Sequence, residues 1–204
     1  MPFQFQPPVI VHAYKAEFPK AELWIPYISG GPDDAAVHAV NEHIRQSAQE
    51  LVNGQGSLDD PRAEMFGYFE VKNNQKDVLS LSLFNYAYTG GAHGMTLQQS
   101  LTFDVPTGKL YSLSELFKPG SDYVKRLSAL VAKQIAARQI ETLEPFKAIR
   151  PDQSFYVADR SLVLYFNLYE LAAYVYGFLY FPISVYSIQS IIDEQGPLGK
   201  MLES

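Results

Sequence analysis

Residues 78–105 constrain the fold of this chain more than any other stretch. Apolar and polar side chains alternate over residues 79–83, and the alternation returns over residues 97–105. A period of two is typical of a strand with one buried face. Three glycines lie between residues 90 and 94, which predicts a bend with at least one glycine at positive φ. The stretch therefore predicts a β-hairpin, and a phase change near Phe84 indicates a bulge or burial of both faces.

Six further segments carry strand patterns bounded by turn residues, such as the pairs Pro19-Lys20 and Asp159-Arg160. They lie at residues 9–18, 21–28, 63–72, 155–158, 162–166 and 178–183. Residues 73–76 are expected to form the turn before the hairpin, and Pro182 indicates a strand end or an edge strand.

Apolar residues at helical spacing predict two principal helices. The first begins at residues 32–34, where a proline in the first turn and two aspartates favour a helix start, and continues to about Val52. The second follows Ser121 and ends at the pair Glu144-Pro145. A capping box at residues 112–115 opens a short helix between them, and residues 185–192 suggest a last short helix.

We therefore expect an α+β fold, with a mainly antiparallel sheet, two principal helices packed on it and a short C-terminal helix. The chain is expected to form a single domain over residues 1–204. Its N-terminal half covers residues 9–105, its C-terminal half covers residues 106–192, and residues 193–204 form a loose tail.

Composition excludes several functions. The 204 residues have a net charge of −6, whereas nucleic-acid binding favours basic stripes. The absence of cysteine excludes disulfides, thiol catalysis and cysteine-ligated metal. The first residues lack the regions of a signal peptide, and the apolar segment 162–186 is interrupted by Asn167, Glu170 and Pro182. We therefore expect no nucleic-acid partner and no membrane insertion by this chain.

The histidines do not predict a metal site. His38 and His43 are about 140° apart on the first helix, at about 100° per residue, so they do not converge on one ion. His12 falls in a strand, and only His93 adjoins a glycine bend, where it either caps the loop backbone or acts as a ligand or catalytic residue. The usual nucleophile and phosphate-loop motifs are missing. We expect no enzyme activity, cofactor or metal, although carboxylates such as Glu170 could converge in three dimensions.

Tyrosines are frequent in the loop expected over residues 167–177. Aromatic rings on the flanking strands are expected to pack in the core. The rings of Tyr169, Tyr174 and Tyr176 either pack there too or form an interface, where tyrosine is favoured. Loops on a rigid scaffold often carry binding sites.

An ordered set of short motifs resembles a known family. The set comprises Tyr88-x-Gly90-Gly91-Ala92-His93, Phe103-Asp104, Thr107-Gly108-Lys109, Leu113-x-x-Leu116-Phe117, residues 162–166, Tyr169-Glu170-Leu171-Ala172-x-Tyr174, Gly177 and Pro182. It is similar to the extracytoplasmic domain of RsiV-type anti-sigma factors, which is also the non-catalytic module of PdaC-type peptidoglycan deacetylases. The resemblance covers roughly residues 9–192.

The resemblance implies a binding function outside the cell. In RsiV-type sensors this domain binds lysozyme, and in the deacetylases the chemistry belongs to a separate metal-dependent domain. This chain is therefore expected to be an extracytoplasmic binding module that recognises a lysozyme-like protein or cell-wall glycan, although it lacks a signal peptide and a transmembrane helix. A soluble scaffold for another protein and a hydrolase with a non-linear site remain alternatives.

The segments Tyr88–His93 and Tyr169–Tyr176 together form the candidate binding site. Both follow strands, so a sheet could bring the two loops to one edge. An acidic domain would also associate faster with a basic lysozyme. The alternative for Tyr169-Glu170 is structural, with the hydroxyl and the carboxylate bonding loop amides. The candidate partner-binding residues are Tyr88, His93, Tyr169, Glu170, Tyr174 and Tyr176.

Overall fold

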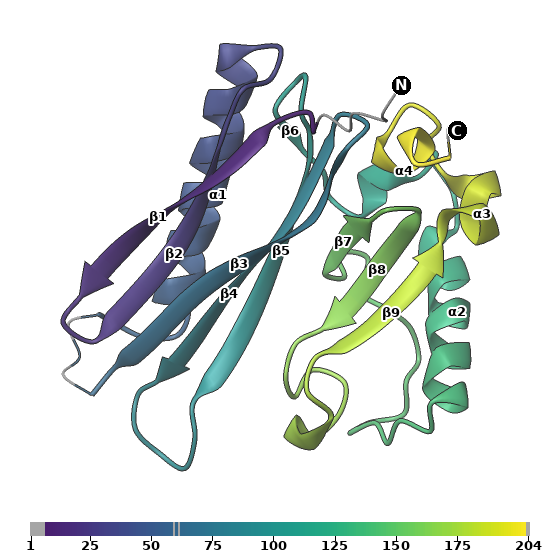
Figure 1. Cartoon of the computed structure of the whole chain (residues 1–204). Helices are drawn as coiled ribbons and strands as arrows, with labels where there is room; N and C mark the ends of the chain where they lie inside the picture. Colours follow the sequence, from purple (N-terminus) through teal and green to yellow (C-terminus); the bar gives the residue numbers. More distant parts are fainter. Residues whose placement is uncertain (1–6, 59, 61, 203–204) are drawn as a thin grey trace, which may run out of the picture. The chain divides into compact units, whose positions relative to one another are not determined.

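The chain folds into two compact units, Met1–Leu110 and Tyr111–Ser204. The computed structural model describes residues 7–58, 60 and 62–202. The expected fold class is confirmed, because mainly antiparallel strands combine with a few helices, and the strands fall into two separate sheets (Figure 1). The expectation of a single domain over the whole chain stays a prediction.

The first unit is built on a six-stranded sheet with the order β1-β2-β3-β4-β5-β6. All neighbouring strands are antiparallel except β2 and β3, which run parallel over residues 21–23 and 65–67. The hairpin expected at residues 78–105 is confirmed as the paired strands β4 and β5 in the interior of this sheet. The strands are β1 Ile10–Phe18, β2 Ala21–Ser29, β3 Glu64–Gln75, β4 Val78–Tyr88, β5 Met95–Asp104 and β6 Lys109–Leu110.

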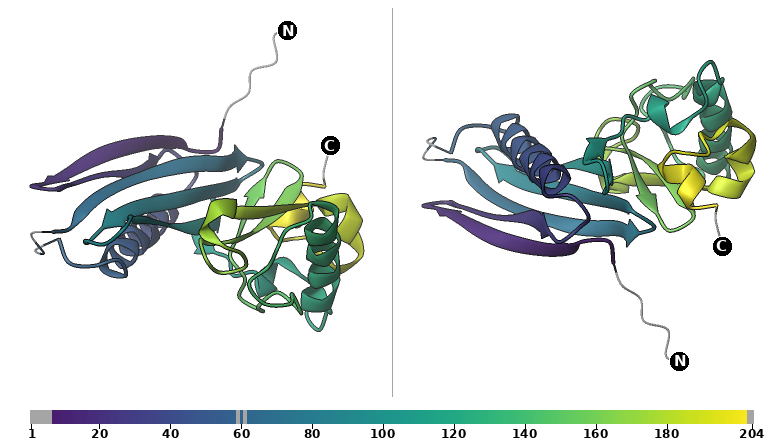
Figure 2. Two further views of the ribbon diagram at one scale, coloured as in Figure 1. Left: turned by 90° about the horizontal axis from the view of Figure 1, so that it is seen from below. Right: turned by 90° about the horizontal axis from the view of Figure 1, so that it is seen from above.

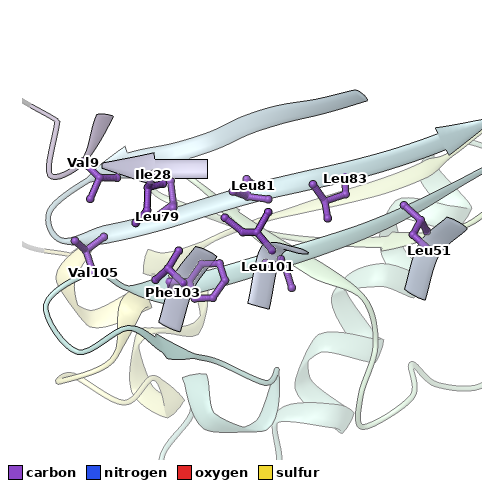
Figure 3. Close-up of a cluster of buried hydrophobic side chains, with 11 residues drawn as sticks. Val9, Ile28, Leu51, Leu79, Leu81, Leu83, Leu101, Phe103 and Val105 are labelled. Atoms are coloured by element: carbon purple, nitrogen blue, oxygen red, sulfur yellow. The ribbon is translucent and has the colours of Figure 1, made fainter. Parts of the chain in front are cut away.

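Helix α1, Asp34–Asn53, connects β2 to β3 and lies across one face of the sheet (Figures 1 and 2). Asp33 caps the helix, since its carboxylate accepts the amide protons of Ala35 at 2.7 Å and Ala36 at 3.0 Å. The sequence had predicted Pro32 in the first turn of the helix, but Pro32 precedes the capping residue and lies outside the helix. The apolar stripe of α1 meets side chains of β4 and β5, and Figure 3 shows this core around Leu81, Leu101 and Phe103.

The hairpin of β4 and β5 shows which of the two explanations, a bulge or burial of both faces, accounts for the change in apolar alternation near Phe84. Its register runs without a shift from Val78 opposite Asp104 to Ala87 opposite Met95, so no bulge lies at Phe84. Residues 78–85 are instead buried on both faces of the strand. The glycine prediction is confirmed, because φ is +97° at Gly90 and +120° at Gly91.

The turn before this hairpin is shorter than predicted. Strand β3 continues to Gln75, with a register shift between Val71 and Asn73, and the turn is formed by Lys76 and Asp77 at φ +53° and +57°. The side-chain amide of Asn73 donates to the carbonyl of Val78 at 2.7 Å. This bond lets an asparagine that is typical of turns occupy a strand position.

The second unit contains a three-stranded antiparallel sheet with the order β7-β8-β9 and helix α2, which contacts β9. Shorter turns of helix lie at Ser114–Leu116, Tyr174–Tyr176 (η2) and Gln189–Ile191. The longer elements are α2 Tyr123–Ala137, β7 Phe155–Ala158, β8 Ser161–Phe166, β9 Leu179–Ser184, α3 Val185–Ile188 and α4 Pro197–Lys200.

Helix α2 ends earlier than predicted. It stops at Ala137, and Gln139 has φ +52°, although the first proline of the segment is Pro145. The chain then runs beside the loop after β8, with the amide of Leu143 donating to the carbonyl of Leu171 at 3.0 Å. Pairing with a distant loop thus replaces the last two turns expected for the helix.

Residues 193–202 are packed, which corrects the expectation of a loose tail over residues 193–204 for the part of it that the structure describes; residues 203 and 204 lie outside the described residues. Helix α4 buries Leu198 and Met201, which are 0% and 1% exposed. A Cβ at Gly199 would lie 2.1 Å from the carbonyl oxygen of Glu194, so only glycine fits this turn. In the part of the chain that the structure describes, no helix has the length and apolar character needed to cross a bilayer.

Candidate binding loop

The loop over residues 167–177 joins β8 to β9 in the second unit (Figure 1). It exposes large apolar side chains. Tyr169 is 44% exposed and Tyr174 is 39% exposed, and their ring centroids lie 5.6 Å apart. Val175, in the short helix η2, is 87% exposed. Tyr176 is more buried, and its hydroxyl accepts the amide proton of Glu141 at 3.2 Å. The loop therefore presents two rings and a valine, while a third ring holds it to the neighbouring segment.

The side chain of Glu170 stabilises the conformation of this loop through hydrogen bonds and an ion pair. Its carboxylate accepts the amide proton of Asn167 at 2.7 Å and a proton from Nε2 of Gln153 at 3.2 Å, and it forms an ion pair with Arg150. Gln153 is 1% exposed and also donates to the carbonyl of Tyr165 at 2.8 Å. These contacts match the structural alternative for the Glu170 carboxylate. A direct role of Glu170 in binding a partner stays a prediction.

Tyr169 takes an unusual backbone conformation at the tip of the loop. Its φ is +63°, in the left-handed region that disfavours residues with a Cβ. Such strain persists only where surrounding contacts hold the backbone, and here the neighbouring carboxylate of Glu170 bonds the amide at the start of the turn. The contacts of the next residue thus support the backbone conformation of Tyr169.

A hollow of about 770 Å³, lined by both polar and apolar side chains, lies beside Tyr169. One wall comes from the segment that follows α2, and the other comes from β8 and the loop. Leu143 at its rim is 55% exposed, so the apolar surface of the loop continues onto this segment. The lining residues are Leu143, Glu144, Pro145, Phe146, Lys147, Ala148, Arg150, Gln153, Phe166, Tyr169, Glu170 and Leu171.

Tyr88, the last residue of β4, and His93, in the loop between β4 and β5, belong to the first unit. The hydroxyl of Tyr88 donates to the carbonyl of Gly91 at 3.1 Å, and Nδ1 of His93 donates to the carbonyl of Gly94 at 2.9 Å. Both side chains thus bond the backbone of their own loop, which is the capping role considered for His93. The two candidate loops follow strands of two different sheets, and a shared binding face stays a prediction.

The other histidines make contacts within the first unit. Nε2 of His12 lies 2.7 Å from the hydroxyl of Ser29, and its ring stacks on Tyr27 with centroids 4.9 Å apart. The ring of His43 lies 6.1 Å from that of Phe103. Among the described residues, no three histidine, aspartate or glutamate side chains are grouped so that they could hold a metal ion.

Sequence reasoning missed the residues that hold the candidate loop. Arg150 and Gln153 are 20 and 17 residues away from Glu170, and no local pattern links them. Leu143 fell in the region predicted as the end of a helix.

Two family models match this chain, one on each side of the boundary between the two units. Residues 13–96 match the family model described as "Deacetylase PdaC", and residues 114–186 match the model described as "Protein of unknown function (DUF3298)". The peptidoglycan-N-acetylmuramic acid deacetylase PdaC of Bacillus subtilis (strain 168) is 25% identical over 170 residues, which are 80% of this chain and 36% of that protein. The anti-sigma-V factor RsiV of the same strain is 26% identical over 183 residues, which are 82% of this chain and 63% of that protein.

This chain is homologous to PdaC and RsiV. The resemblance expected from the motifs is thus confirmed, and the chain spans less than two thirds of the length of either relative. Two solved structures share the fold. A DUF3298 family member from Bacteroides fragilis superposes with a TM-score of 0.74 at 15% identity, covering 96% of this chain and 98% of that one. A member from Pseudomonas aeruginosa PAO1 gives 0.69 at 17% identity, with coverages of 93% and 95%.

Proposed function

We propose that this chain is a non-catalytic binding domain, and that its loop over residues 167–177 recognises a lysozyme-like protein. The observation that carries the proposal is the exposed Tyr169, held at positive φ by the contacts of Glu170. Exposed tyrosines are common anchors of protein interfaces. A loop that is already ordered loses less entropy when it binds a partner.

The choice of a lysozyme-like partner rests on the homology to RsiV and on charge. The RsiV-type resemblance implies lysozyme binding, and PdaC by its name acts on peptidoglycan, so the relatives connect this domain with the cell wall and with proteins that act on it. A net charge of −6 favours association with a basic protein. A location outside the cytoplasm, which the RsiV-type resemblance implies, is part of the same proposal.

The contacts of Glu170 support a binding role over hydrolysis. A general acid or base needs a carboxylate that can reach a substrate proton. The carboxylate of Glu170 is instead engaged by Asn167, Gln153 and Arg150. The proposal therefore treats the loop as a rigid docking surface.

The test is a calorimetric titration of the whole chain with hen egg-white lysozyme, for the parent and three variants. Tyr169→Asn removes the ring and keeps a residue that tolerates positive φ. Tyr174→Ala removes the second ring. Tyr186→Ala is the matched control, because this tyrosine is 51% exposed but follows the far end of β9. We expect each loop variant to bind about tenfold more weakly or worse, a loss of about 1.4 kcal/mol, and the control to bind like the parent.

Each outcome of the titration bears on one part of the proposal. No heat of binding for the parent at about 100 μM would reject a lysozyme-like partner. Equal affinities for parent and loop variants would reject the loop as the site. Release of products from cell-wall fragments would reject the non-catalytic role, and binding of those fragments without lysozyme binding would favour a glycan ligand. For the expected complex, the association rate should fall as salt is added.

A further inference from the structure

Strand β1 is the outermost strand of the six-stranded sheet (Figure 1). It pairs along its whole length with β2, and within the described residues no strand lies on its other side. An edge strand of nine residues presents a row of backbone donors and acceptors that can pair with another strand. Natural proteins often protect such an edge with charges, prolines or bulges.

The hairpin of β1 and β2 has little support from the rest of its sheet. Strand β2 pairs with β3 only over Ala21–Leu23. Further along, Asn41 of α1 takes the place of a neighbouring strand, because its side-chain amide accepts the proton of Ile28 N–H at 2.7 Å and donates to the carbonyl of Ile28 at 3.0 Å. Two-stranded ribbons are only marginally stable by themselves, so a third strand on the β1 side would stabilise this one.

Three large apolar side chains of β1 are exposed on one face of the strand. Ile10 is 58% exposed, Tyr14 is 42% exposed and Phe18 is 44% exposed. They are spaced by four residues, and the positions between them on that face are His12 and Ala16. The rings of Tyr14 and Phe18 also border a hollow of about 250 Å³ between β1 and α1.

This pattern is self-complementary in the antiparallel direction. The apolar residues are symmetric about Tyr14, with Ile10 four positions before it and Phe18 four positions after it. A second copy of β1 running antiparallel and centred on Tyr14 therefore sets Ile10 against Phe18 and Tyr14 against Tyr14. Apolar pairs directly opposite one another stabilise a sheet. We propose that a second copy of this chain pairs with β1 in this register and extends the sheet across a twofold axis at Tyr14.

Charge and length favour this register over its neighbours. A register centred on Lys15 sets two lysines directly opposite each other, which is destabilising. Hydrogen bonds to the carboxylates of Glu17 and Glu22 raise the pKa of Lys15, so both lysines would be charged. A register centred on Ala16 overlaps only residues 14–18. Centring on Tyr14 pairs the whole of β1, with Lys15 opposite Ala13 and Glu17 opposite Val11.

The absence of native cysteine allows a direct test of the register by cross-linking. Residues opposite themselves at a twofold axis have Cβ atoms close enough for a disulfide. We expect Tyr14→Cys to form a disulfide-linked dimer under mild oxidation. Ala16→Cys should not, because it faces His12 of the second copy. Phe66→Cys on β3 measures the background from random collisions, since Phe66 is 45% exposed and lies away from the edge.

Sedimentation of the unmodified chain gives a second measurement. We expect a concentration-dependent dimer, and Tyr14→Lys should shift it to monomer while leaving the circular dichroism spectrum unchanged, because the side chain is exposed. The proposal is overturned if the parent stays monomeric at every concentration up to about 1 mM. It is also overturned if Tyr14→Cys cross-links no more than Phe66→Cys, or if Ala16→Cys cross-links best. None of these results depends on lysozyme binding.

Discussion

Tyr169 and Glu170 are adjacent in the sequence and differ in what they contact. The ring of Tyr169 is 44% exposed beside Tyr174, whereas the side chain of Glu170 is 20% exposed and turns toward Asn167 and Gln153. The two side chains therefore differ in role: the ring of Tyr169 is exposed to solvent, and the carboxylate of Glu170 orders the turn. Any functional test of the loop has to separate these roles.

Replacing Glu170 is expected to loosen the loop and to lower the stability of the protein. Glu170→Ala removes a charged acceptor from the amide of Asn167, and such hydrogen bonds contribute about 1.5 to 3 kcal/mol. We expect a loss of this size in the free energy of unfolding, and faster hydrogen exchange at the Asn167 amide. Glu170→Gln should lose less, because its side-chain oxygen can still accept that proton.

Glu144 provides the control for this experiment. It lines the same hollow and is exposed, so Glu144→Ala removes the same charge without a bond to the loop backbone. If Glu170→Ala abolishes lysozyme binding while stability and exchange match the Glu144→Ala protein, Glu170 is a direct contact and the positioning role is wrong.

For single residues, the sequence predicts local conformation better than it predicts hydrogen-bond partners that lie far away in the chain. The tyrosines in the loop between two apolar strands left core packing and an interface as alternatives, and the glycines after Tyr88 indicated positive φ, which Gly90 and Gly91 have. The bonds of Glu170 could not be predicted, because Arg150 and Gln153 reach it across the fold. The same limit applies to Asn41, whose bonds to Ile28 join a helix to a strand.

Helices and strands were predictable where a local pattern coincides with tertiary packing. The alternation in β4 and β5 and the apolar spacing in α1 both face one core, so these elements have nearly the expected bounds. The predictions failed where distant contacts decide the conformation. Helix α2 ends at Ala137 because the next residues pair with the loop after β8, and the glycine- and proline-rich C-terminus packs as α4.

The packed C-terminal helix leads to a stability prediction. Leu198 is 0% exposed, and replacing a buried leucine by alanine costs about 2 to 5 kcal/mol. We expect Leu198→Ala to lower the free energy of unfolding in urea by an amount in this range. Leu143→Ala is the matched control, because Leu143 is 55% exposed and should change stability little. Equal stabilities for the two variants would mean that the tail does not pack as described.

Over the whole molecule, the structure divides the chain into two compact units, and the single domain expected from the sequence stays a prediction. Each unit has its own sheet and its own buried side chains, and each family match falls within one unit. No break in composition marks the boundary near Leu110, because the connection is short and carries no linker-like stretch. For this reason the sequence predicts a single domain.

We expect residues 111–204 to fold when produced alone. This unit encloses a core of its own, in which Leu127, Leu164 and Phe181 are fully buried. Its length is sufficient for a small domain, and a unit with its own core can in principle fold independently. Urea unfolding of the isolated fragment, followed by circular dichroism, should be cooperative. The chain of 204 residues should then show two transitions, one of which matches that of the fragment. A fragment without cooperative unfolding, together with one transition in the whole chain, would instead establish the single domain that the sequence predicts.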